Sequence, residues 1–446
     1  MRSTRSKLVI AAVGIVLIPH GMAASEDLEA QMRAMQERML QLEDRLENTT
    51  DQLDTANQRI EEQEQVMEKA GIGDTSSGLS TFLETIEIGG WVSASYFYNF
   101  NDPDGRALGG ANTGGFAYPF KPDANSFQLD QVWFEIERPV SEESRAGFRL
   151  DFVYGKTAEL LNAGPESPDG VAGSDEDFEL YQAYVQYLAP IGNGVTFQFG
   201  KFATVIGAEV AQAPYNLNVT RGNVYNLFQP ITHTGILATT EFGGGFTGKL
   251  GFVNETRSFP ARDIDLNKDK AVLWSLGFAP TETWSTSFNG AYGESDSGQG
   301  VDEPAGDREL ILDWILSFTP TERFTAYINA DYIDSENSRP AGDEFDGYGV
   351  AIAGRYALTD RLGLALRGEW VDLDFQDSGS DLEVWGLTTT VDFALTSNLM
   401  LRGEVRYDNV NSSSPSDLFF DDSDALFGVG TEDDQVAAGV EVIYTF

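Results

Sequence analysis

From about residue 85 onward the chain alternates apolar and polar residues with a period of two. In the segment FRLDFVYG, Phe148, Leu150 and Phe152 fall on one face, while Arg149 and Asp151 fall on the other. A period of two is typical of β-strands whose two faces meet different surroundings. The same apolar face, free of charged residues, recurs at every second position of 272–278, 310–318, 324–332, 348–356, 362–370 and 399–407.

The faces opposite these positions carry polar and charged residues, among them Glu309, Asp313, Asn329 and Asp331, and are predicted to face water. A soluble β-sandwich alternates in the same way, but its finite core rarely sustains the pattern over a domain of this length. Several strands also begin and end with aromatic residues, as in the two girdles of a membrane barrel. The pattern therefore favours an all-β transmembrane barrel over residues 85–446, with its apolar face toward outer-membrane lipid.

Short and long connections alternate between the predicted strands. Short turns at 279–282, 319–322, 357–360 and 394–397 recur about every 40 residues, one per hairpin. Longer acidic segments lie between them, at 296–307, 334–346, 372–381 and 408–434. Short periplasmic turns and long outer loops are typical of bacterial barrels, and the count of segments predicts about 16 antiparallel strands, wide enough for an aqueous channel.

The chain ends on a strand in which Val440, Val442, Tyr444 and Phe446 share the outward face. This strand is predicted to pair with the first one, IEIGGWVSASYFYNF, because pairing would close the barrel and remove both sheet edges. The ending resembles the terminal-aromatic signal by which the barrel-assembly machinery recognises its clients, with Phe446 as the last residue.

The N-terminal part follows other patterns. Residues 1–23 combine a basic start, an apolar run and a small-residue cleavage site, and are predicted to be a signal peptide; the run is shorter than the roughly 20 residues of a spanning helix. Residues 25–70 repeat apolar residues with heptad spacing and predict an α-helical coiled coil in the periplasm. An isolated amphipathic helix is the alternative, but a strict heptad stripe is too narrow to pack on a globular core. Residues 71–84 begin with a Gly/Ser-rich run and predict a flexible linker.

Charge and composition exclude several classes of function. The chain carries 71 acidic and 29 basic residues, a formal charge of −42, so it offers no clustered positive surface for nucleic acid. It contains no cysteine, which excludes a disulfide framework and thiol catalysis. Of its two histidines, His20 leaves with the signal peptide, so a histidine-based hydrolase would depend on His233 alone. We expect no enzymatic activity and no cofactor, apart from a weak calcium candidate.

The connection from Ala203 to Ile231 is roughly 30 residues long, which is too long for an ordinary loop. It is the third of the long loops, is less acidic than the others, and carries apolar residues suited to packing inside another structure. Its surroundings, from GKF at 200–202 through GAE at 207–209 and TR at 220–221 to THTG at 232–235, resemble the OmpL-like β-barrel porin family. Thr220 stands where serine is expected. The heptad segment resembles the periplasmic extension of certain trimeric, substrate-selective porins.

These resemblances imply a homotrimeric outer-membrane porin with a water-filled channel for passive diffusion of ions and small hydrophilic solutes. The third loop would fold inward and narrow the channel, with the constriction residues Glu209, Asn218, Arg221 and His233. The alternatives are a non-conducting structural tether or adhesin barrel and, for the heptad segment, a spacer toward the cell wall that does not associate.

Seven polar residues on the predicted wet faces are candidates for the pore wall: Arg149, Arg355, Arg367, Glu369, Arg402, Glu404 and Arg406. A row of fixed cations facing acid from an inward loop would set a transverse field that orients solutes. The alternative is that each arginine pairs with an adjacent carboxylate, such as Glu369 or Glu404, and keeps the wall hydrated.

One acidic segment has part of a calcium-loop pattern. Asp263, Asp265, Asn267 and Asp269 place oxygen ligands at alternate positions. The mid-loop glycine and the bidentate glutamate of such loops are missing, so a solvated acidic loop is the alternative.

Overall fold

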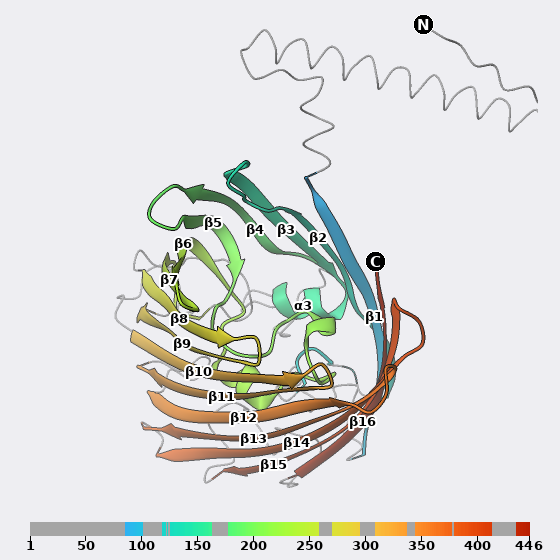
Figure 1. Ribbon diagram of the computed structural model, residues 1–446. Coiled ribbons are helices and arrows are strands. Elements are labelled where there is room, and N and C mark those ends of the chain that lie inside the picture. Colours follow the sequence, from blue (N-terminus) through green and yellow to red (C-terminus); the bar gives the residue numbers. More distant parts are fainter. Residues whose placement is uncertain are drawn as a thin grey trace, which may run out of the picture. The chain divides into compact units, whose positions relative to one another are not determined.

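The computed structural model describes residues 85–100, 118–121, 123, 125–162, 177–257, 270–294, 308–336, 344–376, 379–412 and 434–446. Sixteen antiparallel strands in this part of the chain form a closed barrel, in which each strand pairs with its neighbours in sequence and the last pairs with the first (Figure 1). The predicted all-β barrel and its strand number are confirmed. The predicted coiled coil, signal peptide and linker lie outside the described residues.

The strands are β1 (Glu87–Asn99), β2 (Ser126–Arg138), β3 (Ala146–Tyr154), β4 (Phe178–Ala189), β5 (Val195–Ala203), β6 (Thr232–Gly243), β7 (Phe246–Val253), β8 (Ala271–Thr281), β9 (Trp284–Glu294), β10 (Arg308–Thr321), β11 (Phe324–Ser335), β12 (Phe345–Ala357), β13 (Leu362–Phe375), β14 (Ser380–Ala394), β15 (Leu399–Ser412) and β16 (Asp434–Thr445). The connections contain α3 (Lys156–Asn162), the 3-10 helix η1 (Ala213–Tyr215) and α4 (Asn223–Phe228). No helix in the described part of the chain is long and apolar enough to cross a membrane.

The ring closes where the two ends of the sheet meet. Strand β16 pairs with β1 from Trp91↔Thr445 to Asn99↔Ala437. The backbone of Phe446 extends this ladder, because its N–H donates to Gly90 O at 3.0 Å and its C=O accepts from Gly90 N at 3.1 Å. The predicted closure is confirmed, and it leaves neither strand with an unpaired edge.

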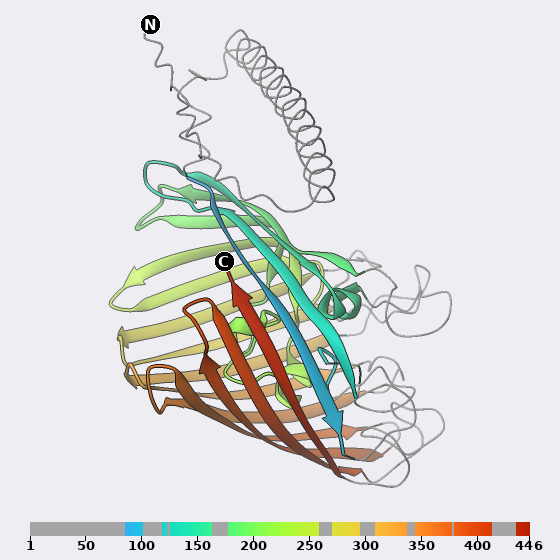
Figure 2. The same cartoon turned by 90° about the vertical axis from the view of Figure 1, so that its right-hand side faces the viewer.

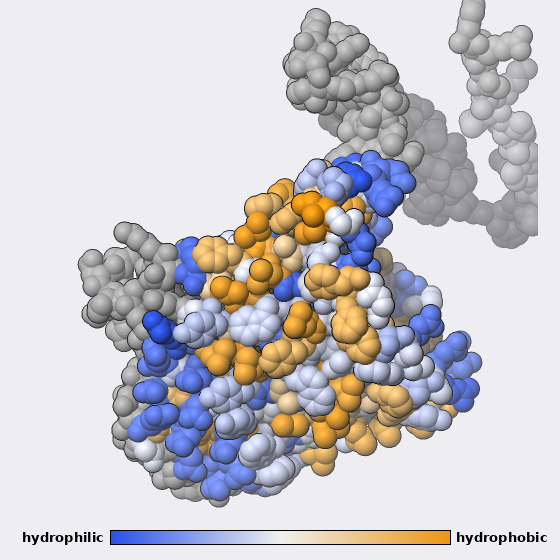
Figure 3. All heavy atoms as spheres, turned by 60° about the vertical axis from the view of Figure 1, so that its left-hand side comes forward, coloured by the Kyte–Doolittle hydropathy of each residue, from blue (hydrophilic) through white to orange (hydrophobic). Residues whose placement is uncertain are grey.

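The outer surface carries the apolar residues that the alternation assigned to lipid. Leu276, Ile352, Leu366 and Val405 are all exposed on this surface, and Figure 3 shows hydrophobic residues spread over the barrel wall between more hydrophilic ends. Exposure of so many large apolar side chains suits hydrocarbon and not water.

Connections at the two ends of the barrel differ in length, as expected. At one end β8 and β9 are joined through Glu282 and Thr283 alone, whereas at the other end β5 and β6 are separated by 204–231. Figure 2 shows this longer segment running inside the tilted strands. The end with the short turns is the periplasmic end of such barrels.

One predicted long loop is wrong. The acidic segment 372–381 was expected to be a loop, but β13 continues to Phe375 and β14 begins at Ser380. Leu373↔Leu382 and Asp374↔Asp381 are paired positions of the ladder, so the acidic residues extend a hairpin. The alternation of inward and outward side chains, and not the acidic composition, determines that this segment forms strands.

The inward face is not uniformly wet, contrary to the prediction. Toward the long-loop end several inward side chains are apolar and buried, as at Ile311, Ile333 and Val371. They belong to one buried hydrophobic cluster with Val224 and Phe228 of α4. A hydrophobic core therefore fills part of the barrel interior between wall and loop.

Candidate functional site

The connection Thr204–Ile231, here called the inner loop, crosses the barrel interior. Its ends are on β5 and β6, yet Ala208 N donates to Asn329 Oδ1 on β11 at 2.8 Å. Asn218 Nδ2 donates to Thr390 Oγ1 on β14 at 2.8 Å. The loop thus contacts strands on the far side of the barrel, as Figure 1 also shows.

A buried arginine organises the inner loop from within. The Arg221 guanidinium donates to Val210 O and Val219 O, each at 3.0 Å, and to Ala211 O. It also lies 4.6 Å from the ring centroid of Phe120, which is a cation–π distance. Burial lowers the pKa of Arg221 below its ordinary value, and the backbone carbonyls supply the compensating negative ends of dipoles. The loop is therefore a folded unit with its own core.

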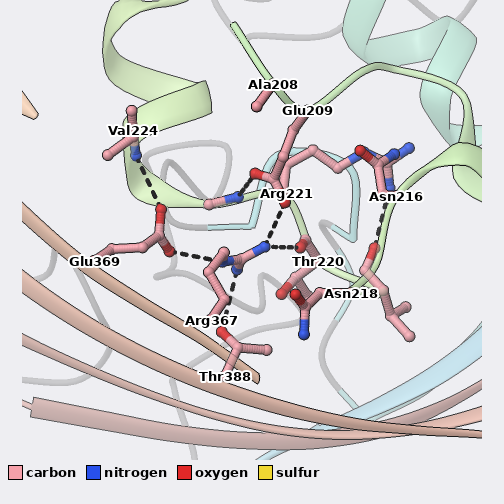
Figure 4. A network of polar contacts seen from close by, with 12 residues as sticks. Ala208, Glu209, Asn216, Asn218, Thr220, Arg221, Val224, Arg367, Glu369 and Thr388 are labelled. Carbon is pink, nitrogen blue, oxygen red and sulfur yellow. Dashed lines mark hydrogen bonds and ion pairs between the residues drawn. The ribbon is translucent and has the colours of Figure 1, made fainter. Parts of the chain in front are cut away.

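Arg367 on β13 joins the wall to this unit (Figure 4). Its Nη1 donates to Glu209 Oε1 and to Thr220 O, both at 2.7 Å. On the wall side its Nε donates to Glu369 Oε2 at 2.9 Å and its Nη2 to Thr388 Oγ1 at 3.1 Å. One guanidinium thus makes hydrogen bonds to the wall and to the inner loop at once, because its N–H donors point in several directions in one plane.

Arg402 on β15 repeats this arrangement. It donates to Asn216 O at 3.0 Å and to Ala213 O at 3.1 Å in the inner loop, and it pairs with Glu441 on β16. Its wall partner is a carboxylate of the adjacent strand, because Arg402 and Glu441 occupy paired positions of β15 and β16.

Arg406, also on β15, contacts the start of α4. It donates to Arg221 O at 2.7 Å and to Asn223 Oδ1 at 2.8 Å. Asp408 pairs with it at 2.8 Å and accepts a hydrogen bond from the Tyr118 hydroxyl at 2.9 Å.

Near these arginines, the wall carboxylates Glu404 and Glu369 accept backbone N–H groups of the inner loop. Glu404 accepts from Val219 N at 2.6 Å, from Thr220 N at 3.0 Å and from Thr220 Oγ1 at 2.6 Å. Glu369 accepts from Val224 N in the first turn of α4 at 3.2 Å. We call the five wall residues Arg367, Glu369, Arg402, Glu404 and Arg406 the wall clamp.

The candidate pore residues fall into two groups. The wall-clamp side chains are only 0–4% exposed, so they contact the inner loop and one another and not open lumen. Arg149 and Arg355 keep side-chain exposures of 21% and 32% near the periplasmic ends of β3 and β12. Both are ion-paired, Arg355 with Asp392 at 2.6 Å.

The candidate constriction residues lie at or beside the inner loop. Glu209, Asn218 and Arg221 belong to it, whereas His233 lies on β6. His233 is buried, with Nε2 3.1 Å from Thr204 Oγ1 and Nδ1 3.3 Å from Glu255 O, and so fixes the base of the loop.

The weak calcium candidate, Asp263, Asp265, Asn267 and Asp269, lies outside the described residues. Within the described part, no group of three or more histidine, aspartate or glutamate side chains is arranged to hold a metal ion.

A lysine that was not predicted from the sequence belongs to the same network. Lys121, between β1 and β2, is buried and lies 2.7 Å from Asp130 on β2 and 2.9 Å from Glu441 on β16. The alternation on these strands places both carboxylates inward. Nothing near Lys121 in the sequence indicates that its loop returns into the barrel.

Polar inward side chains that stay partly exposed gather toward the periplasmic end. Tyr184, Gln198 and Lys249 share this property with Arg149 and Arg355.

Comparison with known proteins gives a family and a fold. The model of the family described as "Putative beta-barrel porin-2, OmpL-like" matches residues 85–446. Among solved structures, OprB of Pseudomonas putida at high pH is similar, with 12% identity and a TM-score of 0.53 over 83% of this chain and 96% of that one. OmpT of Vibrio cholerae is similar in its outer-membrane expressed form and in its trimer form, each with 12% identity, a TM-score of 0.50 and 81% of this chain covered, over 97% and 99% of those chains. At these identities the structures show the fold alone. No curated protein matches the chain.

Proposed function

The chain belongs to the OmpL-like family of β-barrel porins, and from this premise we propose that it forms a water-filled channel for passive diffusion of ions and small hydrophilic solutes, narrowed by the inner loop. The family and the fold are those of an outer-membrane barrel protein and point to a channel, not to an enzyme.

The observation that carries the proposal is the attachment of the inner loop across the interior. The buried wall clamp holds one side of the loop with charge-assisted hydrogen bonds, which are stronger than neutral ones. A loop held in this way reduces the lumen cross-section at a fixed place. Polar wall side chains such as Gln198 and Lys249 then provide a hydrated surface on the remaining path.

Planar-bilayer recording of the purified, folded protein tests this function. We expect stepwise conductance increments as single channels insert. Heat-unfolded protein in the same detergent serves as the control. Protein that inserts, as shown by protection of the barrel in liposomes, but never conducts would contradict a channel.

A second candidate, a non-conducting structural tether or adhesin barrel, is supported by the buried core near the long-loop end. Val224 and Phe228 of α4 belong to one buried hydrophobic cluster with Ile311, Ile333 and Val371 of the wall, where a wide pore would have water. A tether or adhesin predicts that the protein inserts but does not conduct in the same recordings.

We further propose that ion selectivity depends on the partly exposed arginines and not on the wall clamp. Arg149 and Arg355 act on solutes over about 8 Å in physiological salt. The wall-clamp charges are compensated by their partners and covered by the inner loop, so they fix the position of the loop and do not act on passing ions.

The proposed function includes assembly of the barrel into oligomers. One of the similar structures, OmpT of Vibrio cholerae, is described in a trimer form, and we propose a homotrimer for this chain, with the heptad segment 25–70 in the periplasm. We also propose that the barrel-assembly machinery recognises the terminal strand through Phe446, whose ring is half-exposed beside Phe134, with centroids 5.5 Å apart.

A further inference from the structure

Three polar residues occupy neighbouring inward positions on three adjacent strands. Asn289 on β9 pairs with Asp313 on β10, which pairs with Asp331 on β11. Their exposures are 1%, 1% and 4%. The two carboxylates therefore lie side by side in the interior of the barrel.

Neutral amides surround these carboxylates. Asn289 Nδ2 donates to Asp313 Oδ2 at 2.5 Å, and Asn329 Nδ2 donates to Asp313 Oδ1 at 2.6 Å and to Asp331 Oδ2 at 2.8 Å. The Gly207 N–H also donates to Asp313. The two carboxyl groups also lie within hydrogen-bond reach of each other. Among the described residues, neither aspartate has a lysine or arginine partner. By contrast, Glu309 on the same strand as Asp313 pairs with Arg257 at 3.0 Å.

Three oxygen atoms in this cluster lack a hydrogen-bond donor among the described residues. They are Asp331 Oδ1, Asn289 Oδ1 and Gln229 Oε1. Gln229 is 3% exposed and joins the cluster through its Nε2, which donates to Asn329 Oδ1 at 3.0 Å. Buried acceptors without donors are rare in folded proteins and point to a missing partner.

Two kinds of partner could compensate the buried negative charge. A proton shared by Asp313 and Asp331 removes one charge and supplies one donor, which leaves at least two of the three oxygens unsatisfied. A hard cation binds carboxylate and amide oxygens alike and compensates both charges when it is divalent. The cation therefore accounts for more of the observed donor set.

We propose that Asp313, Asp331, Asn289 and Gln229 form a binding site for a calcium ion. Calcium takes six to eight oxygen ligands in flexible geometry, whereas magnesium requires a near-ideal octahedron and retains several waters, which suits a nearly dry cluster less well. The ligands come from both the wall and the inner loop, so bound calcium ties Gln229 to β9–β11.

The site is distinct from the acidic segment 263–269 and does not depend on whether the barrel conducts. Calcium binding to full-length, folded protein in detergent, stripped with a chelator, is measured by equilibrium dialysis with radioactive calcium. The double variant Asp313→Asn with Asp331→Asn is compared with the control variant Asp263→Asn with Asp265→Asn. We expect the first to bind calcium at least about tenfold more weakly and the second to bind like the parent.

Equal binding by the parent and the Asp313/Asp331 variant, including no binding by either, would overturn the site, as would loss confined to the Asp263/Asp265 variant. Since removing both carboxylates could prevent folding, Asn289→Asp is the second test. A third carboxylate in the donor set is expected to tighten calcium binding about tenfold, because affinity follows ligand charge. Affinity unchanged or weakened in folded Asn289→Asp protein would favour the shared proton and refute the calcium site.

Discussion

The Arg367 guanidinium on β13 lies 2.7 Å from the carboxylate of Glu209 in the inner loop, 158 residues earlier in the chain. Both side chains are buried. The same arginine also pairs with Glu369 on its own strand, so loop and wall share one cation. The position of the inner loop thus depends on contacts between residues far apart in sequence.

Glu209→Gln is expected to lower the free energy of unfolding by about 1–3 kcal/mol, because the charged acceptor of Arg367 and of Gly222 N becomes a neutral one. The loss stays below that of a fully broken buried pair, since Glu369 and Thr220 O still compensate Arg367. Denaturant unfolding in lipid vesicles measures it, in a double-mutant cycle with Arg367→Met. Glu143→Gln, on an exposed turn, is the control. If the effects of Glu209→Gln and Arg367→Met on the free energy of unfolding were additive, the ion pair would contribute nothing to stability.

Deleting Gln212–Asn226 is expected to raise single-channel conductance while the barrel stays folded. The deletion removes η1, Arg221 and most of α4, and it uncovers the wall clamp to water. The strand ladders do not include these residues, so closure by β1 and β16 is retained. Conductance is compared with that of Tyr215→Ala, which alters one exposed side chain of the same segment. A folded deletion variant with the parent's conductance would remove the inner loop from the conduction path.

Arg149→Gln and Arg355→Gln are each expected to raise the cation-over-anion permeability ratio by about twofold, because each removes a partly exposed positive charge and leaves its carboxylate partners. Reversal potentials across a salt gradient measure the ratio. Arg406→Gln is the matched comparison: its guanidinium is fully buried, so we expect lost stability with little change in selectivity. A larger selectivity change for Arg406→Gln than for Arg355→Gln would place the wall clamp on the ion path.

Gly207→Ala is expected to destabilise the inner loop. The residue has φ +92°, and a Cβ there would lie 1.8 Å from the side-chain amide carbon of Gln229. Strain in this backbone region costs about 1–3 kcal/mol before the clash is added. Gly244→Ala is the matched control, because Gly244 has φ +64° but nothing within 4 Å of the added atom. Unfolding free energies that fall equally in both variants would mean that only backbone strain matters at Gly207.

The lipid-facing half of the barrel could be predicted because its physical requirement is local. Every second residue of a strand such as 362–370 must be apolar to contact hydrocarbon, and this rule appears directly in the sequence. The same rule places Arg355 and Arg367 on the inner face. The rule does not distinguish the partly exposed Arg355 from the buried Arg367, since the sequence patterns around the two residues are alike.

What separates these two arginines is where the inner loop lies. Arg367 is covered because Glu209 and Thr220 reach it across the lumen, whereas Arg355 is near the periplasmic end and pairs with Asp392 on the wall. Burial of inward residues is thus a tertiary property. For the same reason the sequence did not predict Lys121 in the network, or the apolar core around Phe228.

A peptide of residues 25–70 is expected to associate into a trimer in solution. Its heptad seam of Leu and Met residues is too narrow for a globular core and is suited to helices that meet along one stripe. A trimer matches the assembly proposed for the barrel, and a linker to the first strand would raise the effective concentration of protomers.

Sedimentation equilibrium of the peptide gives its oligomer number, and the full-length protein lacking 25–70 shows whether the barrels associate without it. Replacing Leu42 and Leu46 by Ser should make the peptide monomeric, because both lie on the seam. A monomeric parent peptide, combined with trimers that survive the deletion, would leave this segment only the function of a spacer.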